Sequence, residues 1–273
     1  MKAKKQKAID IALSNALFDD RKAAEAAFLA GEVTWEGKRL KAGDMLNPDE
    51  CSLHIHRAIP YAGKGGFKLQ GALDDFGISV VGLTCIDAGA STGGFTDCLI
   101  QHCASLVYAV DVGFGQLAGS LRQNNRVLNL ERTNISDAKL RALSPTPVLA
   151  TVDLSYLSLR KAIPQFAEIL HEQGEMLCLV KPLFEIDDAG ARRSGIIPED
   201  AYAPLLEALI RDINHLPYAA VRDVTHSHVT GNAGTREFFL HVCLGHEKND
   251  PLLLSDKIPS VIERARLLEE YRK

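Results

Sequence analysis

Four charged residues fall at the ends of predicted strands and helices, where their side chains could move protons. Asp153 and Lys181 each end an apolar strand, in Thr-Val-Asp-Leu-Ser and Leu-Val-Lys-Pro-Leu. Lys68 begins a predicted helix, and Glu237 opens the last predicted strand. A polar residue at the carboxyl edge of a parallel sheet points into the crevice where such sheets bind ligands. Alone, Lys68 and Glu237 are better explained as surface charges or a structural ion pair, but the four together form a candidate catalytic set.

A glycine-rich turn between an apolar strand and a helix is the strongest single motif. It reads Asp-Ala-Gly-Ala-Ser-Thr-Gly-Gly-Phe-Thr-Asp over 87–97, and its glycines would let a ligand approach the backbone. Its spacing is neither that of a dinucleotide-binding fingerprint nor that of a phosphate loop. Asp111 ends the next strand, where a carboxylate can hold a ribose diol, and Asp87 could approach the methionine end of S-adenosylmethionine. The same diol contact occurs in NAD enzymes, and an empty tight turn is the structural alternative.

The charged set suits methylation of a hydroxyl group by S-adenosylmethionine. The oxygen must lose its proton as it attacks the methyl carbon, and two neighbouring lysines lower each other's pKa, so that one can act as a base. The two carboxylates would orient the lysines and balance their charge, because buried ammonium groups without counter-ions are costly. Alignment of the oxygen, the methyl group and the sulfur would supply much of the rate.

From about residue 58, short apolar runs alternate with helix-compatible segments. Five runs predict strands over 83–87, 106–111, 127–130, 148–153 and 176–181. Strands that alternate with helices are typical of a parallel, doubly wound α/β sheet. Two more runs, 219–224 and 237–244, have no helix between them and predict an antiparallel hairpin at the sheet edge. The charged tail 258–273 has apolar residues at helical spacing and predicts a surface helix.

The first 57 residues have a different pattern, which predicts a small α+β module. Two short helices over 4–16 and 20–30 precede a strand at 33–35, a turn at Glu36-Gly37 and a strand at 52–56. This segment holds ten Lys or Arg against nine Asp or Glu, so a local basic face is possible but composition does not establish one. We divide the chain into residues 1–57, a linker 58–64 and residues 65–273, and the glycines around the linker suggest a hinge.

Composition limits the classes of protein that fit. The chain has 273 residues, 46% of them hydrophobic and 24% charged, as in ordinary globular proteins. A net charge of −4 argues against coating nucleic acid by bulk charge. No apolar run approaches the roughly 20 residues that span a bilayer, and the N-terminus lacks a signal-peptide core, so we expect a cytoplasmic protein. The six cysteines show no Cys-x-x-Cys spacing, and we expect buried, reduced thiols.

Taken in order, these motifs resemble the TlyA-type ribosomal RNA ribose methyltransferases, historically called hemolysins. That family joins an S4-type RNA-binding domain to an FtsJ-like (RrmJ) methyltransferase domain, and the resemblance covers nearly the whole chain. The matching segments are 20–38 in the S4-like part, then 65–69, 87–97, 109–113, 131–134 and the Asp153 and Lys181 motifs. The resemblance implies a Rossmann-like S-adenosylmethionine methyltransferase sheet with an antiparallel last strand, plus a small α+β S4-like N-terminal domain.

The resemblance also implies an activity, which is 2′-O-methylation of a cytidine ribose in ribosomal RNA, with S-adenosylmethionine as cofactor and ribosomal subunits as partners. The family's Lys-Asp-Lys-Glu tetrad would be Lys68, Asp153, Lys181 and Glu237. Cofactor contacts would come from Asp87, Gly89, Ala90, Ser91, Thr92, Gly93, Gly94, Phe95, Asp111, Val112, Asn134 and Asp153. RNA contacts would come from Lys4, Arg21, Lys22, Lys38, Arg39 and Lys64.

Several positions depart from the family pattern. Gly63-Lys64 stands where the family usually has Ser-Arg, and Leu183 where it often has Gln. The loop 227–235 differs from the common Ser-Pro-x-x-Gly-Pro-x-Gly-Asn at positions that include His228, Asn232 and Thr235, and Ala8-Ile9-Asp10 replaces Arg-Leu-Asp. These changes leave the cofactor turn and the tetrad intact and bear on the choice of target nucleotide.

Two groups of histidines could in principle serve further chemistry. His54 and His56 follow Cys51, but alternation along a strand accounts for both, and no second pair of zinc ligands is evident. His226 and His228 flank a serine without a nucleophile elbow, so we expect a loop that contacts substrate or solvent. The sequence therefore predicts no metal site.

Three other functions fit parts of the sequence. A nicotinamide-dependent oxidoreductase would use the same turn but leaves the charged set unexplained. A non-catalytic RNA-binding or ribosome-associated protein with a methyltransferase fold is opposed by the intact charged set. A membrane-active hemolysin is opposed by the lack of a spanning or strongly amphipathic segment.

Overall fold

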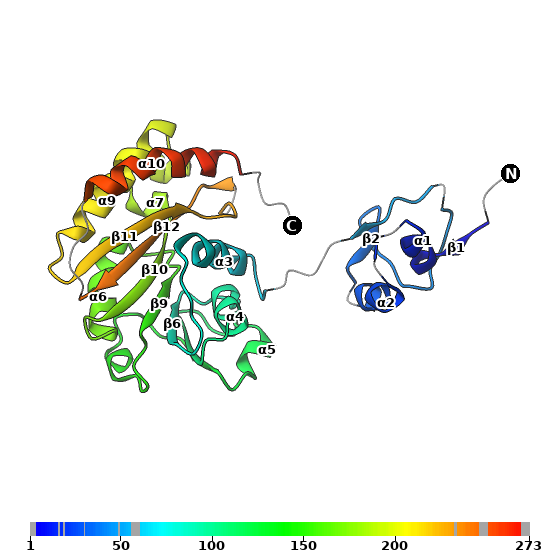
Figure 1. Cartoon of the computed structure of the whole chain (residues 1–273), viewed down its shortest axis with the longest axis horizontal. Helices are drawn as coiled ribbons and strands as arrows, with labels where there is room; N and C mark the ends of the chain where they lie inside the picture. Colours follow the sequence, from blue (N-terminus) through cyan, green and yellow to red (C-terminus); the bar gives the residue numbers. More distant parts are fainter. Residues whose placement is uncertain are drawn as a thin grey trace. The chain divides into compact units, whose positions relative to one another are not determined.

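The chain forms two compact units, residues 1–60 and 61–273 (Figure 1). The computed structural model describes residues 4–15, 17–18, 20–29, 31–48, 50–55, 61–231, 234–245 and 251–268. Residues 61–64, which the sequence placed in a linker, pack on the second unit. The backbone amide of Ala62 donates to Asp97 at 2.7 Å, and the Gly66 amide donates to the Gly63 carbonyl at 3.0 Å.

A seven-stranded sheet forms the centre of the second unit, in the order β11-β12-β10-β9-β6-β7-β8. The strands are β6 (Thr84–Ala88), β7 (Leu106–Asp111), β8 (Val127–Glu131), β9 (Leu149–Val152), β10 (Gly174–Val180), β11 (Ala219–His226) and β12 (Phe238–Leu244). Neighbours from β10 to β8 are parallel, whereas β12 is antiparallel to both β10 and β11. The predicted doubly wound sheet with an antiparallel last strand is confirmed. The predicted antiparallel hairpin at the sheet edge is confirmed, with β11 as the edge strand and β12 between β11 and β10.

Helices cover both faces of this sheet (Figure 1). One face carries α3 (Gly65–Phe76), α4 (Gly94–Gln101) and α5 (Gly119–Arg122), and the other carries η1 (Ala138–Ala142), α6 (Leu159–Ile169), α9 (Tyr202–Asn214) and α10 (Pro251–Arg266). Side chains alternate between the faces of a strand, so in β6 Cys85 packs toward α3 and α4 while Ile86 and Ala88 pack toward the other layer. Three short segments, α7 (Pro182–Glu185), α8 (Ala189–Ser194) and η2 (Glu199–Ala201), follow β10.

The C-terminal helix begins earlier than the sequence predicted. We expected it over 258–273, but α10 runs from Pro251 to Arg266. Leu254 is buried in the same cluster as Ile258 and Val261, so the apolar stripe starts one turn before the predicted boundary. Proline is well tolerated in the first turn of a helix, where its missing N–H has no partner to lose. Residues 269–273 of the predicted helix lie outside the described residues.

The described residues of the first unit form two helices and five short strands. They are β1 (Gln6–Lys7), α1 (Ala8–Ser14), α2 (Arg21–Leu29), β2 (Val33–Trp35), β3 (Lys38–Arg39), β4 (Met45–Leu46) and β5 (His54–Ile55). Strand β2 pairs with β3 and β5, and β1 pairs with β4. The first helix is shorter than predicted because residues 6 and 7 belong to β1. Glu36 and Gly37 both have positive φ, 50° and 75°, as a two-residue hairpin turn requires. His56 lies outside the described residues.

All six cysteines are free thiols. Five are buried as expected, but Cys103 is exposed and has a positive φ of 65°, because it lies in the turn that follows α4. Among the described residues, the structure has no helix with the length and apolar character needed to cross a membrane.

Candidate active site

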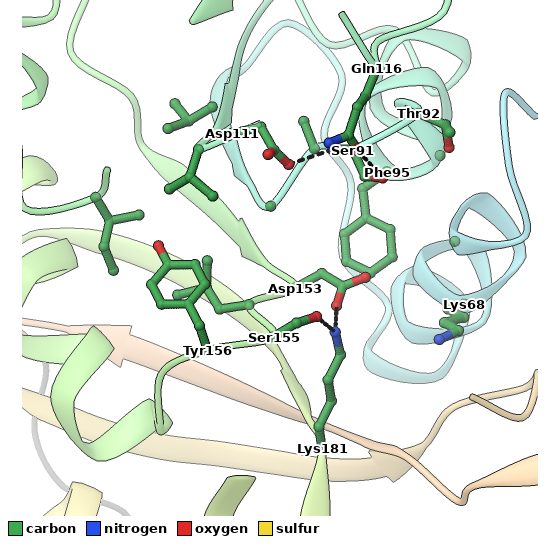
Figure 2. A pocket seen from close by; sticks show the side chains of 18 of the residues that line it. Lys68, Ser91, Thr92, Phe95, Asp111, Gln116, Asp153, Ser155, Tyr156 and Lys181 are labelled. Atoms are coloured by element: carbon green, nitrogen blue, oxygen red, sulfur yellow. Dashed lines mark hydrogen bonds and ion pairs between the residues drawn. The ribbon is translucent and has the colours of Figure 1, made fainter. Parts of the chain in front are cut away.

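A cavity of about 390 Å³ opens at the carboxyl edge of the parallel strands (Figure 2). Turns that follow β6, β7, β8, β9 and β10 line it, together with the first turn of α3 and the residue before β12. Because β12 is antiparallel, its first residue lies at the same edge as the last residues of the parallel strands. The topology therefore brings together residues separated by about 170 positions in the sequence, such as Lys68 and Glu237.

Most of the predicted site residues line this cavity. All four members of the charged set do so, as do nine of the predicted cofactor residues: Gly89, Ala90, Ser91, Thr92, Gly94, Phe95, Asp111, Val112 and Asp153. Asp87, Gly93 and Asn134 do not line the cavity. A Cβ on Gly93 would lie 2.3 Å from Leu121, and the Asn134 side chain accepts from Ser136. Of these three, Asp87 is fully buried, whereas Asn134 is exposed to solvent.

Glycines allow the turn after β6 to pack closely against its neighbours. Gly89 has a φ of 85°, and a Cβ there would lie 2.2 Å from the carbonyl oxygen of Asp153. The amides of Gly89 and Ala90 both donate to the Val110 carbonyl, at 2.9 and 3.1 Å. A Cβ on Gly94 would lie 3.0 Å from the Gly66 nitrogen. Both Gly65 and Gly66 lie inside α3; a Cβ on Gly65 would lie 3.2 Å from Phe95 of α4, and one on Gly66 would lie 2.1 Å from Tyr61.

Asp87 is fully buried beneath the cavity. Its carboxylate accepts hydrogen bonds from the hydroxyls of Thr96 in α4, at 2.6 Å, and Thr151 in β9, at 2.9 Å. Burial raises the pKa of Asp87 to about 6, although these hydrogen bonds oppose the shift. Asp87 therefore ties the start of α4 and strand β9 to β6, which fixes the shape of the glycine turn.

Asp111 is placed to bind a diol. Its two carboxylate oxygens accept from the backbone amides of Ser91, at 2.8 Å, and Gly113, at 2.7 Å. Each carboxylate oxygen can accept a further hydrogen bond, and Asp111 is only partly buried where it lines the cavity. Gln116 lies beside it, because its backbone amide donates to Glu131 at 2.9 Å and its side chain contacts the Ser91 hydroxyl at 3.2 Å.

Lys68 and Glu237 form a buried ion pair at one side of the cavity. Their side chains are 6% and 7% exposed, so neither charge is well solvated. Burial raises the pKa of Glu237, and the neighbouring ammonium of Lys68 opposes that rise. The backbone also holds Glu237 in place, because the Ser227 amide donates to its carbonyl at 2.8 Å.

Lys181 and Asp153 form a second, more accessible pair. Lys181 Nζ lies 2.5 Å from Asp153 Oδ1 and donates to the Ser155 hydroxyl at 2.7 Å (Figure 2). The two side chains are 18% and 22% exposed. Despite the close ammonium, Asp153 Oδ1 is buried and has no directed hydrogen bond from a described residue. The structure therefore pairs each lysine of the charged set with its own carboxylate.

The sequence analysis missed several residues that line the cavity. Ser155 and Tyr156 follow Asp153 in the turn after β9, and Gln116, Thr133 and Ile135 come from the segments after β7 and β8. Ser155 and Tyr156 could have been found from their position just beyond a predicted strand end. Gln116 carried no such signal, since its place depends on the hydrogen bond to Glu131.

The six predicted RNA-binding residues fall in two places. Five lie on the first unit, where Lys4, Arg21, Lys22, Lys38 and Arg39 are exposed. Arg21 also forms an ion pair with Asp10 at 2.9 Å. Lys64 belongs to the second unit, where it is partly buried and lines the cavity.

The model of the FtsJ-like methyltransferase family matches residues 61–244. This chain belongs to the FtsJ-like methyltransferase family. The match begins where the second unit begins and includes the whole seven-stranded sheet. The residues that line the cavity all lie within the FtsJ-like segment.

Relatives match well beyond the FtsJ-like segment. YqxC of Bacillus subtilis, provisionally named an rRNA methyltransferase, is 35% identical over 100% of this chain and 98% of its own length. The 16S/23S rRNA (cytidine-2′-O)-methyltransferase TlyA of Mycobacterium tuberculosis is 35% identical over 75% of each chain. A solved structure from Streptococcus thermophilus, provisionally named a hemolysin, is 32% identical with a TM-score of 0.71 and covers 96% of each chain. The resemblance to TlyA-type proteins is thereby confirmed.

Proposed function

We propose that this protein is an S-adenosylmethionine-dependent methyltransferase that modifies the ribose 2′-hydroxyl of a cytidine in ribosomal RNA. The observation that carries the proposal is the pair of lysine–carboxylate contacts, Lys68–Glu237 and Lys181–Asp153, on one cavity at the carboxyl edge of the sheet. Methyl transfer to an alcohol needs a group that accepts the hydroxyl proton close to the bound cofactor. The lysine–carboxylate pairs are candidates for that group, and the glycine-rich turn on the same cavity is the candidate for binding the cofactor.

The residues of the cavity fit S-adenosylmethionine. The volume of about 390 Å³ lies within the range of roughly 300–1,000 Å³ for small-molecule sites. Asp111 offers carboxylate oxygens to a ribose diol, and the Gly89 turn leaves the backbone open on the cavity side. When bound, the cofactor supplies an electrophilic methyl group on sulfur.

Among the four charged residues, we assign the contact with the ribose hydroxyl to Lys181. Its side chain is more exposed than that of Lys68, and its Nζ lies between Asp153 and Ser155 (Figure 2). In its neutral form, Lys181 holds the 2′-hydroxyl and accepts its proton as the oxygen attacks the methyl carbon, which converts the amine to an ammonium. Asp153 balances the charge of Lys181 through the change of protonation. Lys68 and Glu237, which are almost fully buried, fix the opposite wall and its charge.

Ribosomal RNA is the substrate that the relatives and the first unit support. TlyA of Mycobacterium tuberculosis is named a 16S/23S rRNA (cytidine-2′-O)-methyltransferase, and the match to YqxC extends over this entire chain. We propose that residues 1–57 form an S4-like RNA-binding domain, whose exposed Lys38 and Arg39 on β3 contact phosphates. A ribosomal subunit in the cytoplasm is then the partner.

Transfer of radiolabelled methyl groups from S-adenosylmethionine to purified ribosomal subunits tests the proposal. We expect label in RNA with the wild type and a loss of about 100-fold or more with Lys181→Ala, as removal of a general acid or base typically causes. Lys161→Ala, which removes an exposed lysine of α6, is the matched control and should keep full activity. Equal labelling by wild type and Lys181→Ala would overturn the assignment, and no label with any subunit would overturn the substrate.

A further inference from the structure

A second group of polar side chains lies outside the cavity, where α3 meets the end of β11. Asp75 comes from α3, His226 ends β11, and His228 follows in the loop before β12. None of the three lines the cavity. One potential ligand atom from each lies within 4.8 Å of the others.

The distances are close to those that a metal ion needs. His228 Nε2 lies 3.0 Å from Asp75 Oδ2, and the two imidazole rings have centroids 4.9 Å apart. Ligands at about 2.0–2.1 Å in a tetrahedral site lie about 3.3 Å from one another. An ion could therefore replace the direct contact between His228 and Asp75 with only a small movement of the side chains.

His226 gives an independent reason to expect a bound ligand at this group. The residue is only 8% exposed, and its Nδ1 is buried without a hydrogen-bond partner among the described residues. Buried polar groups are rarely left unpaired. A buried imidazole nitrogen of this kind is available to a metal ion, for which histidine is the commonest ligand.

The surroundings orient these ligands and leave an open position. The Thr225 hydroxyl donates to Asp75 Oδ2, which is the outer contact typical of a ligating carboxylate. The His228 ring packs directly on α3, since a Cβ on Gly71 would lie 2.4 Å from its Cγ. The side chains of His228 and Asp75 are 40% and 23% exposed, so water can reach the fourth position.

A similar group, Glu175, His241 and Cys243, is less suited to a metal. His241 Nε2 already contacts both Glu175, at 2.9 Å, and Cys243, at 3.5 Å. Although burial opposes the shift, these hydrogen bonds raise the pKa of His241 to about 9. A protonated imidazole has no lone pair to offer, so this second group serves as a control.

We propose that Asp75, His226 and His228 bind a Zn²⁺ ion, with water in the fourth position. Two imidazoles and a carboxylate are a ligand set that zinc accepts. The sequence analysis predicted no metal because Asp75 is about 150 positions from the two histidines. The ion fastens α3, which carries Lys68, to the segment that leads to Glu237. Ser227 between the two histidines already holds Glu237 through its amide.

Metal titration of the full chain tests this site without reference to methyl transfer. After chelator treatment and desalting, Zn²⁺ is added in competition with a chromophoric chelator, and Co²⁺ is added to follow its visible absorption in tetrahedral coordination. We expect one equivalent of either ion per chain. Loss of a direct ligand in His228→Gln or Asp75→Asn should weaken binding by at least about 100-fold, the upper end of the effect of outer-shell changes.

His241→Gln is the matched control and should bind like the wild type. His226→Gln should also lose the ion. If the buried position makes this variant misfold, the variants at the partly exposed His228 and Asp75 still test the site, and circular dichroism verifies that they are folded. The absence of stoichiometric binding in the wild type would overturn the proposal. Unchanged affinity in His228→Gln and Asp75→Asn, or loss of the ion in His241→Gln, would do the same.

Discussion

Several ionisable side chains of the second unit are buried away from water. Lys68 and Glu237 neutralise each other there, but Asp87 has only hydroxyl and amide donors around it. A buried carboxylate without a cationic partner favours its protonated form. Asp87 thus stabilises the turn by hydrogen bonds and destabilises the fold whenever it is ionised.

The stability of the second unit should therefore depend on the protonation of Asp87. Its pKa is raised from 3.8 to about 6 in the folded protein, so the folded state holds the proton more tightly than the unfolded state. The free energy of unfolding should fall by about 2 kcal/mol between pH 4 and pH 7, which is most of the roughly 3 kcal/mol that the full shift is worth at about 1.4 kcal/mol per pKa unit.

Urea unfolding followed by circular dichroism at several pH values measures this slope. Asp87→Asn keeps the size of the side chain and removes the titration, so its stability should decline less than that of the wild type over the same range. If the free energy of unfolding changes equally with pH in the wild type and in Asp87→Asn, the pKa of Asp87 is not raised by folding.

Residue types and positions were enough to predict most of the site, because a polar residue that ends an apolar strand contributes little to packing and faces the ligand crevice. All four charged residues of the predicted set line the cavity. The sequence could not predict the pairing of Lys68 with Glu237 and Lys181 with Asp153, which depends on the order of strands. It also could not show that Asp87 lies behind the cavity wall, because burial of one side chain depends on how α4 packs.

At the scale of elements, the turns after β6 and β9 approach each other closely at their backbones. Gly89 lies against the carbonyl of Asp153, so the proposed cofactor turn and the proposed catalytic carboxylate share one contact. Substitution of Gly89 should therefore disturb both turns together.

Gly89→Ala should lower stability and activity. An L-residue in the left-handed region costs about 1–2 kcal/mol, and the new Cβ would also push the Asp153 backbone away. A displacement of about 1 Å at a site can reduce the rate about 100-fold. Gly119→Ala is the control, because a Cβ at the start of α5 meets nothing within 4 Å.

Thermal unfolding and methyl-transfer assays on both variants give the comparison. If Gly89→Ala and Gly119→Ala lose the same stability and the same activity, the close approach to Asp153 is not what constrains the turn.

Element types followed from sequence more readily than their order in space. Hydrophobic runs marked every strand of the sheet to within two residues at each end, and the central strands are apolar throughout because both of their faces are buried. Insertion of β12 between β10 and β11 was not predictable from the runs alone, since strand order depends on long-range packing. The helix α10 was placed too late for a simpler reason, namely that Leu254 is separated from the rest of its stripe by charged residues.

At the scale of the whole molecule, we propose that the first unit binds RNA and that the second unit carries out methyl transfer. Exposed basic residues of the first unit include Lys38 and Arg39 on the β2–β3 hairpin. A net charge of −4 for the chain means that attraction to phosphate must be local. RNA affinity and cofactor affinity should accordingly be separable by mutation.

Lys38→Glu with Arg39→Glu should weaken binding to ribosomal RNA and leave S-adenosylmethionine affinity unchanged. Each lost phosphate contact should reduce the slope of log affinity against log salt by about 0.7–0.9. RNA titrations at several salt concentrations, with calorimetry for the cofactor, measure both. Lys139→Glu with Lys161→Glu makes the same change of charge at exposed sites of the second unit and should have little effect. If both double variants lose the same affinity, the first unit is not the RNA-binding part.

The position of the methyl group on the RNA tests the central claim most directly. Ribosomal subunits are treated with the wild-type protein and S-adenosylmethionine, the RNA is digested to nucleosides, and the products are identified by mass spectrometry. The account predicts new 2′-O-methylcytidine, absent when Lys181→Ala is used. A methyl group on a base, or label that does not reside in RNA, would contradict the assignment of the lysine–carboxylate cavity to ribose methylation.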